Sequence, residues 1–138
     1  SDYSEVACEY ALTLAQTFSS SLLVLHVINE PVDLRGFYVP HISFEQLEKE
    51  IETGAAKMLE NFCQENIKEF SNFETLVATG VPYEEIMRVA AEEDVSLIII
   101  GTHGRTGLDH LIFGSTAERV VRSAPCPVMT IRLPAATP

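Results

Sequence analysis

Residues 95–107 read VSLIIIGTHGRTG, and residues 114–124 read GSTAERVVRSA. In the first stretch a run of apolar residues, expected as a buried strand over 95–100, passes into a glycine-rich loop. The second stretch has the apolar spacing of a helix that begins at Ser115. Glycine lets a backbone approach a ligand closely, and the first turn of a helix presents N–H groups without partners inside the helix. A strand, such a loop and a helix start in this order predict a phosphate-binding site and, with it, a nucleotide ligand.

The remainder of the chain alternates helices and strands. Further helices are expected at 2–18, 44–70 and 82–93, and further strands at 22–28, 73–79 and 128–132. Apolar residues three or four positions apart indicate the helices, a continuous apolar run of β-type residues indicates the strand at 22–28, and 73–79 and 128–132 are shorter strand candidates. This alternation predicts right-handed crossovers and a mostly parallel, open α/β sheet with helices on both faces. We expect one domain over residues 1–138.

The first helix is expected to pack on a sheet. Its large apolar residues recur every four positions, at Val6, Tyr10, Leu14 and Phe18, and Ala7 and Ala11 lie alongside them. The long second helix is expected to turn inward Leu47, Ile51, Ala55, Met58, Leu59 and Phe62. Because alternating α/β domains normally open on a strand, we also expect a strand of roughly six to ten residues before Ser1.

Composition narrows the class of partner. The 138 residues are 46% apolar, and the formal net charge of −11 argues against nucleic acid as a ligand. No apolar run is long enough to span a membrane. The basic residues Arg105, Arg119, Arg122 and Arg132 nevertheless gather in the last 38 residues, beside only two acidic ones. Such a region suits a small anion better than a polymer.

Cysteine and histidine patterns exclude two other kinds of site. The three cysteines, Cys8, Cys63 and Cys126, form no disulfide framework and no zinc motif, and are expected as free thiols in a reducing cytoplasm. The four histidines lack metal-ligand spacing, so we expect no dedicated metal site. Mg²⁺ carried by ATP needs no such site, because it keeps water and phosphate ligands.

The glycine-rich segment resembles the universal stress protein family, in its ATP-binding branch. The family pattern G-x2-G-x9-G-[ST] is matched by Gly101, Gly104, Gly114 and Ser115. Four shorter segments are also similar to the family in the same order: residues 1–5, 25–27, 79–82 and 125–128. The resemblance therefore covers essentially the whole chain.

The resemblance implies a Rossmann-like sheet of five parallel strands in the order 3-2-1-4-5, whose first strand is missing before Ser1. It places ATP between the first and fourth strands, where open α/β sheets bind ligands. The implied contacts are Gly101 and Gly104 with ribose and phosphates, Gly114, Ser115 and Thr116 with phosphates, and Val27 and Ile100 beside adenine. It implies a homodimer through the last strand, residues 128–132. The aspartate that the family places after its first strand has no counterpart here.

Several roles stay open at the level of sequence. Ser115 binds phosphate or only caps the helix, and His103 donates to a phosphate or fixes the loop. Arg105 pairs with the γ-phosphate or is solvated. The absence of a G-x4-G-K-[ST] lysine predicts slow ATP hydrolysis at most.

The sequence thus predicts a cytoplasmic, ATP-binding stress-response regulator that acts through nucleotide occupancy and dimerisation, with AMP or ADP as alternative ligands. Two other functions are weighed beside it. One is an ATP-using enzyme of the adenine-nucleotide α-hydrolase type, and the other is a dimerisation scaffold without nucleotide.

Overall fold

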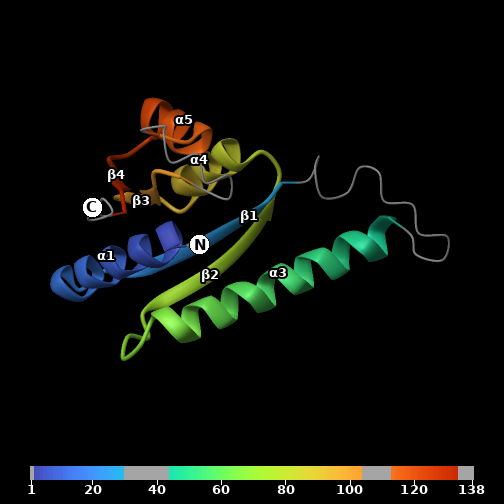
Figure 1. Cartoon of the computed structure of the whole chain (residues 1–138), viewed down its shortest axis with the longest axis horizontal. Coiled ribbons are helices and arrows are strands. Elements are labelled where there is room, and N and C mark those ends of the chain that lie inside the picture. The colour runs from blue at the N-terminus through green and yellow to red at the C-terminus, as the bar shows by residue number, and fades with distance from the viewer. Residues whose placement is uncertain (1, 30–43, 104–112, 134–138) are drawn as a thin grey trace, which may run out of the picture.

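The computed structural model describes residues 2–29, 44–103 and 113–133. Helices and strands alternate along the chain, as the sequence predicts (Figure 1). The elements are α1 (Asp2–Phe18), β1 (Leu22–Ile28), α3 (Phe44–Asn66), β2 (Phe73–Thr79), α4 (Pro82–Glu92), β3 (Ile98–Gly101), α5 (Ser115–Ser123) and β4 (Val128–Ile131). The α/β class with parallel strands is confirmed.

Two predicted boundaries are wrong, each for a local reason. The backbone of Glu69 is left-handed (φ 57°), so α3 ends at Asn66 and does not reach residue 70. At the end of α4, Asp94 is also left-handed (φ 51°), and the Val95 N–H donates to the Ala90 carbonyl at 2.9 Å. Residues 94 and 95 therefore close the helix, and β3 begins only at Ile98.

The described strands form two parallel pairs. β1 pairs with β2 from Leu22↔Phe73 to Ile28↔Thr79, and β3 pairs with β4 from Ile98↔Val128 to Gly101↔Ile131. Within the described residues β1 and β3 are not hydrogen-bonded to each other. The two pairs are therefore separate sheets, and the fifth strand and the order 3-2-1-4-5 stay a prediction.

Helices cover both faces of these strands, as expected. On one face α1 contacts β1 as well as β3 and β4, and α3 lies along β1 and β2 beside it (Figure 1). On the other face α4 contacts β1 and β2, and α5 contacts both α4 and β4. Because α1 touches strands of both pairs, it joins the two halves of the molecule.

The core is built from smaller side chains than the sequence pattern predicts. One cluster joins Cys8 of α1 to Leu59, Cys63 and Ile67 of the α3 region. Around α5, Val120 is completely buried. The buried side of α1 carries Ala7, Cys8 and Ala15, which allow a close approach to the strands.

Three of the large residues predicted to face inward are exposed, which corrects the prediction for both helices. Tyr10 is 53% exposed, Phe18 is 70% exposed and Met58 is 55% exposed. In α3 Leu59, which is also predicted to face inward, is buried, and so is Cys63. The large residues spaced four apart in α1 lie at the edge of the face that packs on the strands. The small residues beside them make the contact with the strands.

The two buried thiols, Cys8 and Cys63, should make the free energy of unfolding depend on pH. Burial raises the pKa of the Cys8 thiol, and Cys63 and Glu9 raise it further, while burial alone raises the pKa of Cys63. The unfolded chain therefore loses these protons first, at its ordinary pKa of about 8.5. The contribution of the two protonated thiols to the free energy of unfolding is therefore fully present below a pH of about 8.5. It is lost as the pH rises toward the pKa values of the thiols in the folded state.

We expect urea unfolding to give a lower free energy of unfolding at pH 9.5 than at pH 7.5, in a reducing buffer. The double variant Cys8→Ala/Cys63→Ala is the control, because it removes both thiols and should show a smaller decrease. Equal decreases in the two proteins would show that these thiols do not titrate differently in the folded and unfolded states.

Candidate functional site

The end of β3 and the start of α5 are joined by backbone hydrogen bonds. The Thr102 N–H donates to the Ile131 carbonyl at 2.9 Å, which extends the β3–β4 pairing by one residue. The Gly114 N–H donates to the Thr102 carbonyl at 2.6 Å. The chain thus leaves the strand and returns to the same point, where α5 begins. We call residues 101–103 and 114–116 the β3–α5 site.

The first turn of α5 is capped by backbone alone. Gly114 occupies the N-cap position with extended backbone angles (φ −73°, ψ 165°) and offers no side chain to the helix. The Glu118 N–H donates to the Gly114 carbonyl at 3.0 Å and begins the helical ladder. The N–H groups of the first turn have no partners within the helix, and the helix dipole adds partial positive charge there. Ser115 is exposed at this end and Thr116 is half-buried.

The strand end is packed against the start of α1. A Cβ placed on Gly101 would lie 2.8 Å from the Cβ of Tyr3, which is closer than real Cβ contacts come. The Tyr3 ring also contacts the His103 ring, with centroids 5.2 Å apart and planes tilted by 52°. Packing therefore accounts for glycine at position 101 without reference to a ligand.

His103 is held on two sides. It is 8% exposed, and its Nδ1 lies 3.1 Å from the Oγ1 of Thr102, which is 1% exposed. One of the two groups donates a hydrogen bond to the other, and the Tyr3 ring restricts the imidazole from a different direction. This arrangement favours the loop-fixing role among the two that the sequence left open for His103.

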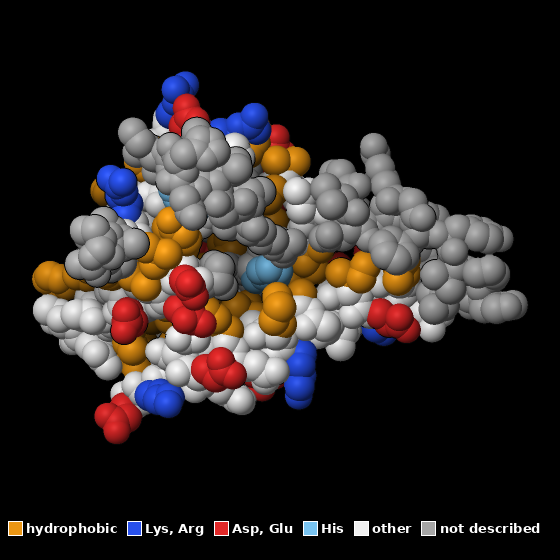
Figure 2. Space-filling view, viewed as in Figure 1, with side chains coloured by type: hydrophobic (Ala, Val, Ile, Leu, Met, Phe, Trp, Pro, Cys, Tyr) orange, Lys and Arg blue, Asp and Glu red, His pale blue; other side chains and the backbone are white. Residues whose placement is uncertain are grey.

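The basic residues near the site are engaged by protein groups. The Arg119 guanidinium lies over the Tyr83 ring at 4.7 Å, and Arg122 Nη2 is 2.9 Å from Glu118 Oε1. Figure 2 shows basic side chains gathered at the α5 end of the molecule, with acidic ones distributed over the half that holds α1. Two of the four arginines of the predicted basic region, Arg119 and Arg122, lie on α5, where Glu118 offsets part of their charge.

The structure brings together most of the predicted site residues. Gly101, His103, Gly114, Ser115 and Thr116 all belong to the β3–α5 site, and Ile100 precedes it in β3. Val27 lies in the other sheet, near the end of β1 and paired with Ala78. Gly104 and Arg105 lie outside the described residues.

Sequence reasoning missed Tyr3 and Thr102 as parts of the site. Thr102 stood within the quoted loop, and its threonine hydroxyl beside a histidine was the available signal. Tyr3 gave no signal, because its contact with His103 joins residues 100 positions apart. Among the residues that the structure describes, no group of histidine, cysteine or acidic side chains is arranged to hold a metal ion. None of the described helices is long and apolar enough to cross a membrane.

Comparison with known proteins places this chain in a family. Residues 1–132 match the universal stress protein family. The chain belongs to that family. Universal stress protein YxiE of Bacillus subtilis is 34% identical over 137 residues, which span 96% of this chain and 93% of YxiE.

Solved structures of universal stress proteins share the fold. MJ0577, a universal stress protein of Methanocaldococcus jannaschii, aligns with a TM-score of 0.82 at 25% identity, over 99% of this chain and 92% of that one. A universal stress protein from Archaeoglobus fulgidus, solved in complex with dAMP, aligns with a TM-score of 0.56 at 21% identity, over 94% and 88% of the two chains. At that identity the likeness is one of fold.

Proposed function

We propose that this universal stress protein binds an adenine nucleotide at the β3–α5 site, with ATP as the principal ligand and AMP and ADP as alternatives. The observation that carries the proposal is the hydrogen bond from the Gly114 N–H to the Thr102 carbonyl. It holds the unpaired N–H groups of the α5 first turn beside a strand end that carries a glycine. Anions bind at such helix starts, and ligands of open α/β folds bind at the carboxyl ends of the strands.

Different residues of the site would contact different parts of the nucleotide. The N–H groups and hydroxyls of Ser115 and Thr116 would bind phosphate oxygens, and Gly104 and Arg105 would approach from the loop. Val27 and Ile100 would pack against adenine. His103 would act by fixing the loop, since its ring already has protein contacts. Any Mg²⁺ would be bound by the phosphates and water.

The proposed role is regulatory. Nucleotide occupancy would be read out through a homodimer formed along β4, whose one described partner strand is β3. Among the described residues of the site we find no pair of a nucleophile and a base, so the proposal includes slow hydrolysis at most. It places the protein in the cytoplasm, where the thiols of Cys8, Cys63 and Cys126 remain reduced.

Isothermal titration with ATP, AMP, ADP and GTP tests the proposal. We expect the three adenine nucleotides to bind and GTP to bind at least tenfold more weakly, because contacts with the base set the preference. Sedimentation velocity with and without ATP reports the dimer. Equal affinity for ATP and GTP would contradict an adenine site, and a sedimentation coefficient that is independent of ATP would contradict the regulatory part.

A further inference from the structure

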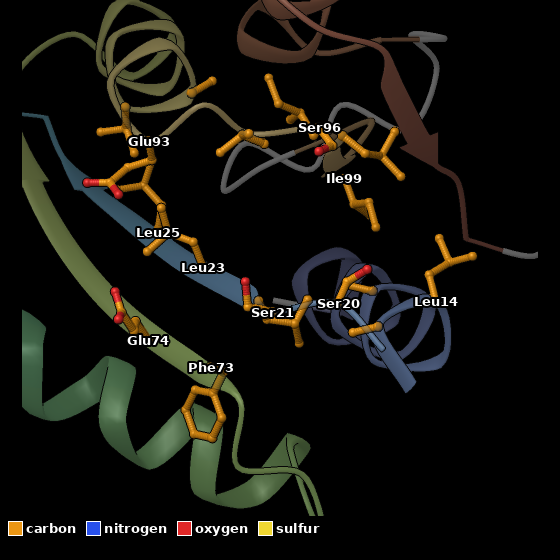
Figure 3. A pocket seen from close by; sticks show the side chains of 18 of the residues that line it. Leu14, Ser20, Ser21, Leu23, Leu25, Phe73, Glu74, Glu93, Ser96 and Ile99 are labelled. Carbon is orange, nitrogen blue, oxygen red and sulfur yellow. The ribbon is translucent and has the colours of Figure 1, made fainter. Parts of the chain in front are cut away.

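α4 and α5 pack against each other on one face of the molecule. α4 contacts β1 and β2, whereas α5 contacts β4 and α4. Ile86, Val89 and Ala90 of α4 line a cavity of about 740 Å³ that separates β1 from β3 (Figure 3). The contact between α4 and α5 therefore joins the two pairs of strands on this face.

An arginine and a tyrosine contact each other where the two helices meet. The Arg119 guanidinium of α5 lies 4.7 Å from the centroid of the Tyr83 ring of α4. We call these two residues the Tyr83–Arg119 stack. Arg122, further along α5, is ion-paired with Glu118, whereas Arg119 forms no ion pair with any carboxylate that the structure describes. A ring contact uses the face of a guanidinium, so the N–H groups on the rim of Arg119 stay available to an anion.

The Tyr83–Arg119 stack lies close to the β3–α5 site. Ser115 and Arg119 are four positions apart, so they lie on the same side of α5, about 6 Å apart along its axis. Helical side chains lean toward the amino end of their helix, so that of Arg119 extends back toward the first turn. Tyr83 is the second residue of α4, so the stack lies between the starts of two helices.

A guanidinium in this place suits the outer phosphates of a nucleotide. The N–H groups at the start of α5 bind one phosphate in the proposed site, and a nucleoside monophosphate has no other. A di- or triphosphate carries further charged oxygens, and arginine binds such oxygens with strong, charge-assisted hydrogen bonds. The Tyr83 ring already restricts the Arg119 side chain, which lowers the conformational entropy lost on binding.

We propose that Arg119, positioned by the Tyr83 ring, binds the phosphates beyond the first, and that the site therefore prefers nucleoside di- and triphosphates to monophosphates. This inference rests on the proposed nucleotide function and adds to it the residue that distinguishes ATP from AMP. Arg119 contacts the ligand. Tyr83 is a positioning residue and acts through Arg119.

Isothermal titration of ATP, ADP and AMP into wild type, Arg119→Gln and Arg122→Gln tests the role of Arg119. We expect the wild type to bind ATP and ADP more tightly than AMP. In Arg119→Gln the ratio of the AMP Kd to the ATP Kd should fall about tenfold, the usual scale for one charge-assisted hydrogen bond. Arg122→Gln is the matched control, because Arg122 is equally exposed on the same helix but is paired with Glu118. It should keep the wild-type ratio.

Two variants of Tyr83 test the positioning role. Tyr83→Phe keeps the aromatic ring and removes only the hydroxyl, which contacts Glu84 at 3.2 Å. It should keep the wild-type ratio of the two Kd values. Tyr83→Leu removes the ring, and the ratio should fall by about two- to fivefold, as expected for an exposed cation–π contact. Equal ratios in the phenylalanine and leucine variants would show that the ring does not position Arg119.

The outcomes separate this inference from the proposed function. If ATP and AMP bind the wild type and the ratio of their Kd values is unchanged in Arg119→Gln, the inference is wrong and the nucleotide site stands. A ratio that falls equally in Arg119→Gln and Arg122→Gln would also overturn it, since the general charge of α5 would then set the preference. If the wild type binds none of the three nucleotides, the proposed function fails and the inference fails with it.

Discussion

Replacing Gly101 by alanine should lower the free energy of unfolding by about 1–3 kcal/mol, the usual cost of adding a methyl group to a packed region. The new Cβ would lie 2.8 Å from the Cβ of Tyr3 and 3.4 Å from the Tyr3 carbonyl oxygen. Backbone cannot yield as the end of a long side chain can, so α1 or β3 must shift. Urea unfolding of the two proteins measures the difference.

Gly54→Ala is the matched control for this substitution. Gly54 lies in α3, and a Cβ there would meet no atom within 4 Å. Alanine is the better helix former by about 1 kcal/mol, so this variant should be more stable than the wild type. Replacing glycine by alanine is thus expected to lower the free energy of unfolding at position 101 and to raise it at position 54.

A double-mutant cycle tests whether the contact with Tyr3 causes the loss of stability in Gly101→Ala. In a Tyr3→Gly background the colliding Cβ is gone, so Gly101→Ala should cost measurably less than in the wild type. If Gly101→Ala were neutral, or if its cost were unchanged in the Tyr3→Gly background, the close approach of α1 to the strand end would be contradicted.

Most of the elements could be predicted from the sequence because they depend on local patterns. The strands over 22–28 and 73–79 and the helix over 115–123 have the predicted bounds. The apolar run of 22–28 lies between Ser21 and Asn29, the segment 73–79 lies between Asn72 and Gly80, and the helix over 115–123 follows Gly114, so turn-forming residues mark these ends. The strand and helix that flank the glycine-rich loop were placed by the same reasoning, and this is why most of the candidate site was found.

The remaining features depend on contacts between distant parts of the chain. Alanine and cysteine, and not the large apolar residues, form the contact face of α1, because the helix lies close to two pairs of strands. The contact of Tyr3 with His103 is likewise tertiary, and no spacing along the chain encodes it. The left-handed residues Glu69 and Asp94 moved two boundaries without a glycine to mark them.

Gly114→Asp should weaken ATP binding by about 100-fold or more, because it places a carboxylate where the proposed site binds phosphate and like charges in contact cost several kcal/mol. The substitution should leave the fold intact. Gly114 is the N-cap residue with φ −73°, which any L-residue adopts. Aspartate is a preferred N-cap residue and differs from glycine there by only a few tenths of a kcal/mol.

Gly114→Asn is the matched control for charge. Asparagine has nearly the same size as aspartate and caps helices equally well, but it is neutral. It should therefore bind ATP more tightly than the aspartate variant, with a loss of about tenfold or less relative to the wild type. Urea unfolding should show all three proteins within about 0.5 kcal/mol of one another, since the cap is retained.

The central claim is that ATP phosphates bind at the start of α5, and isothermal titration of ATP into wild type, Gly114→Asn and Gly114→Asp tests it most directly. We predict affinities that fall in that order, with the aspartate variant at least 100-fold below the wild type. Equal affinities in the three equally stable proteins would contradict the claim and place any bound nucleotide elsewhere on the molecule.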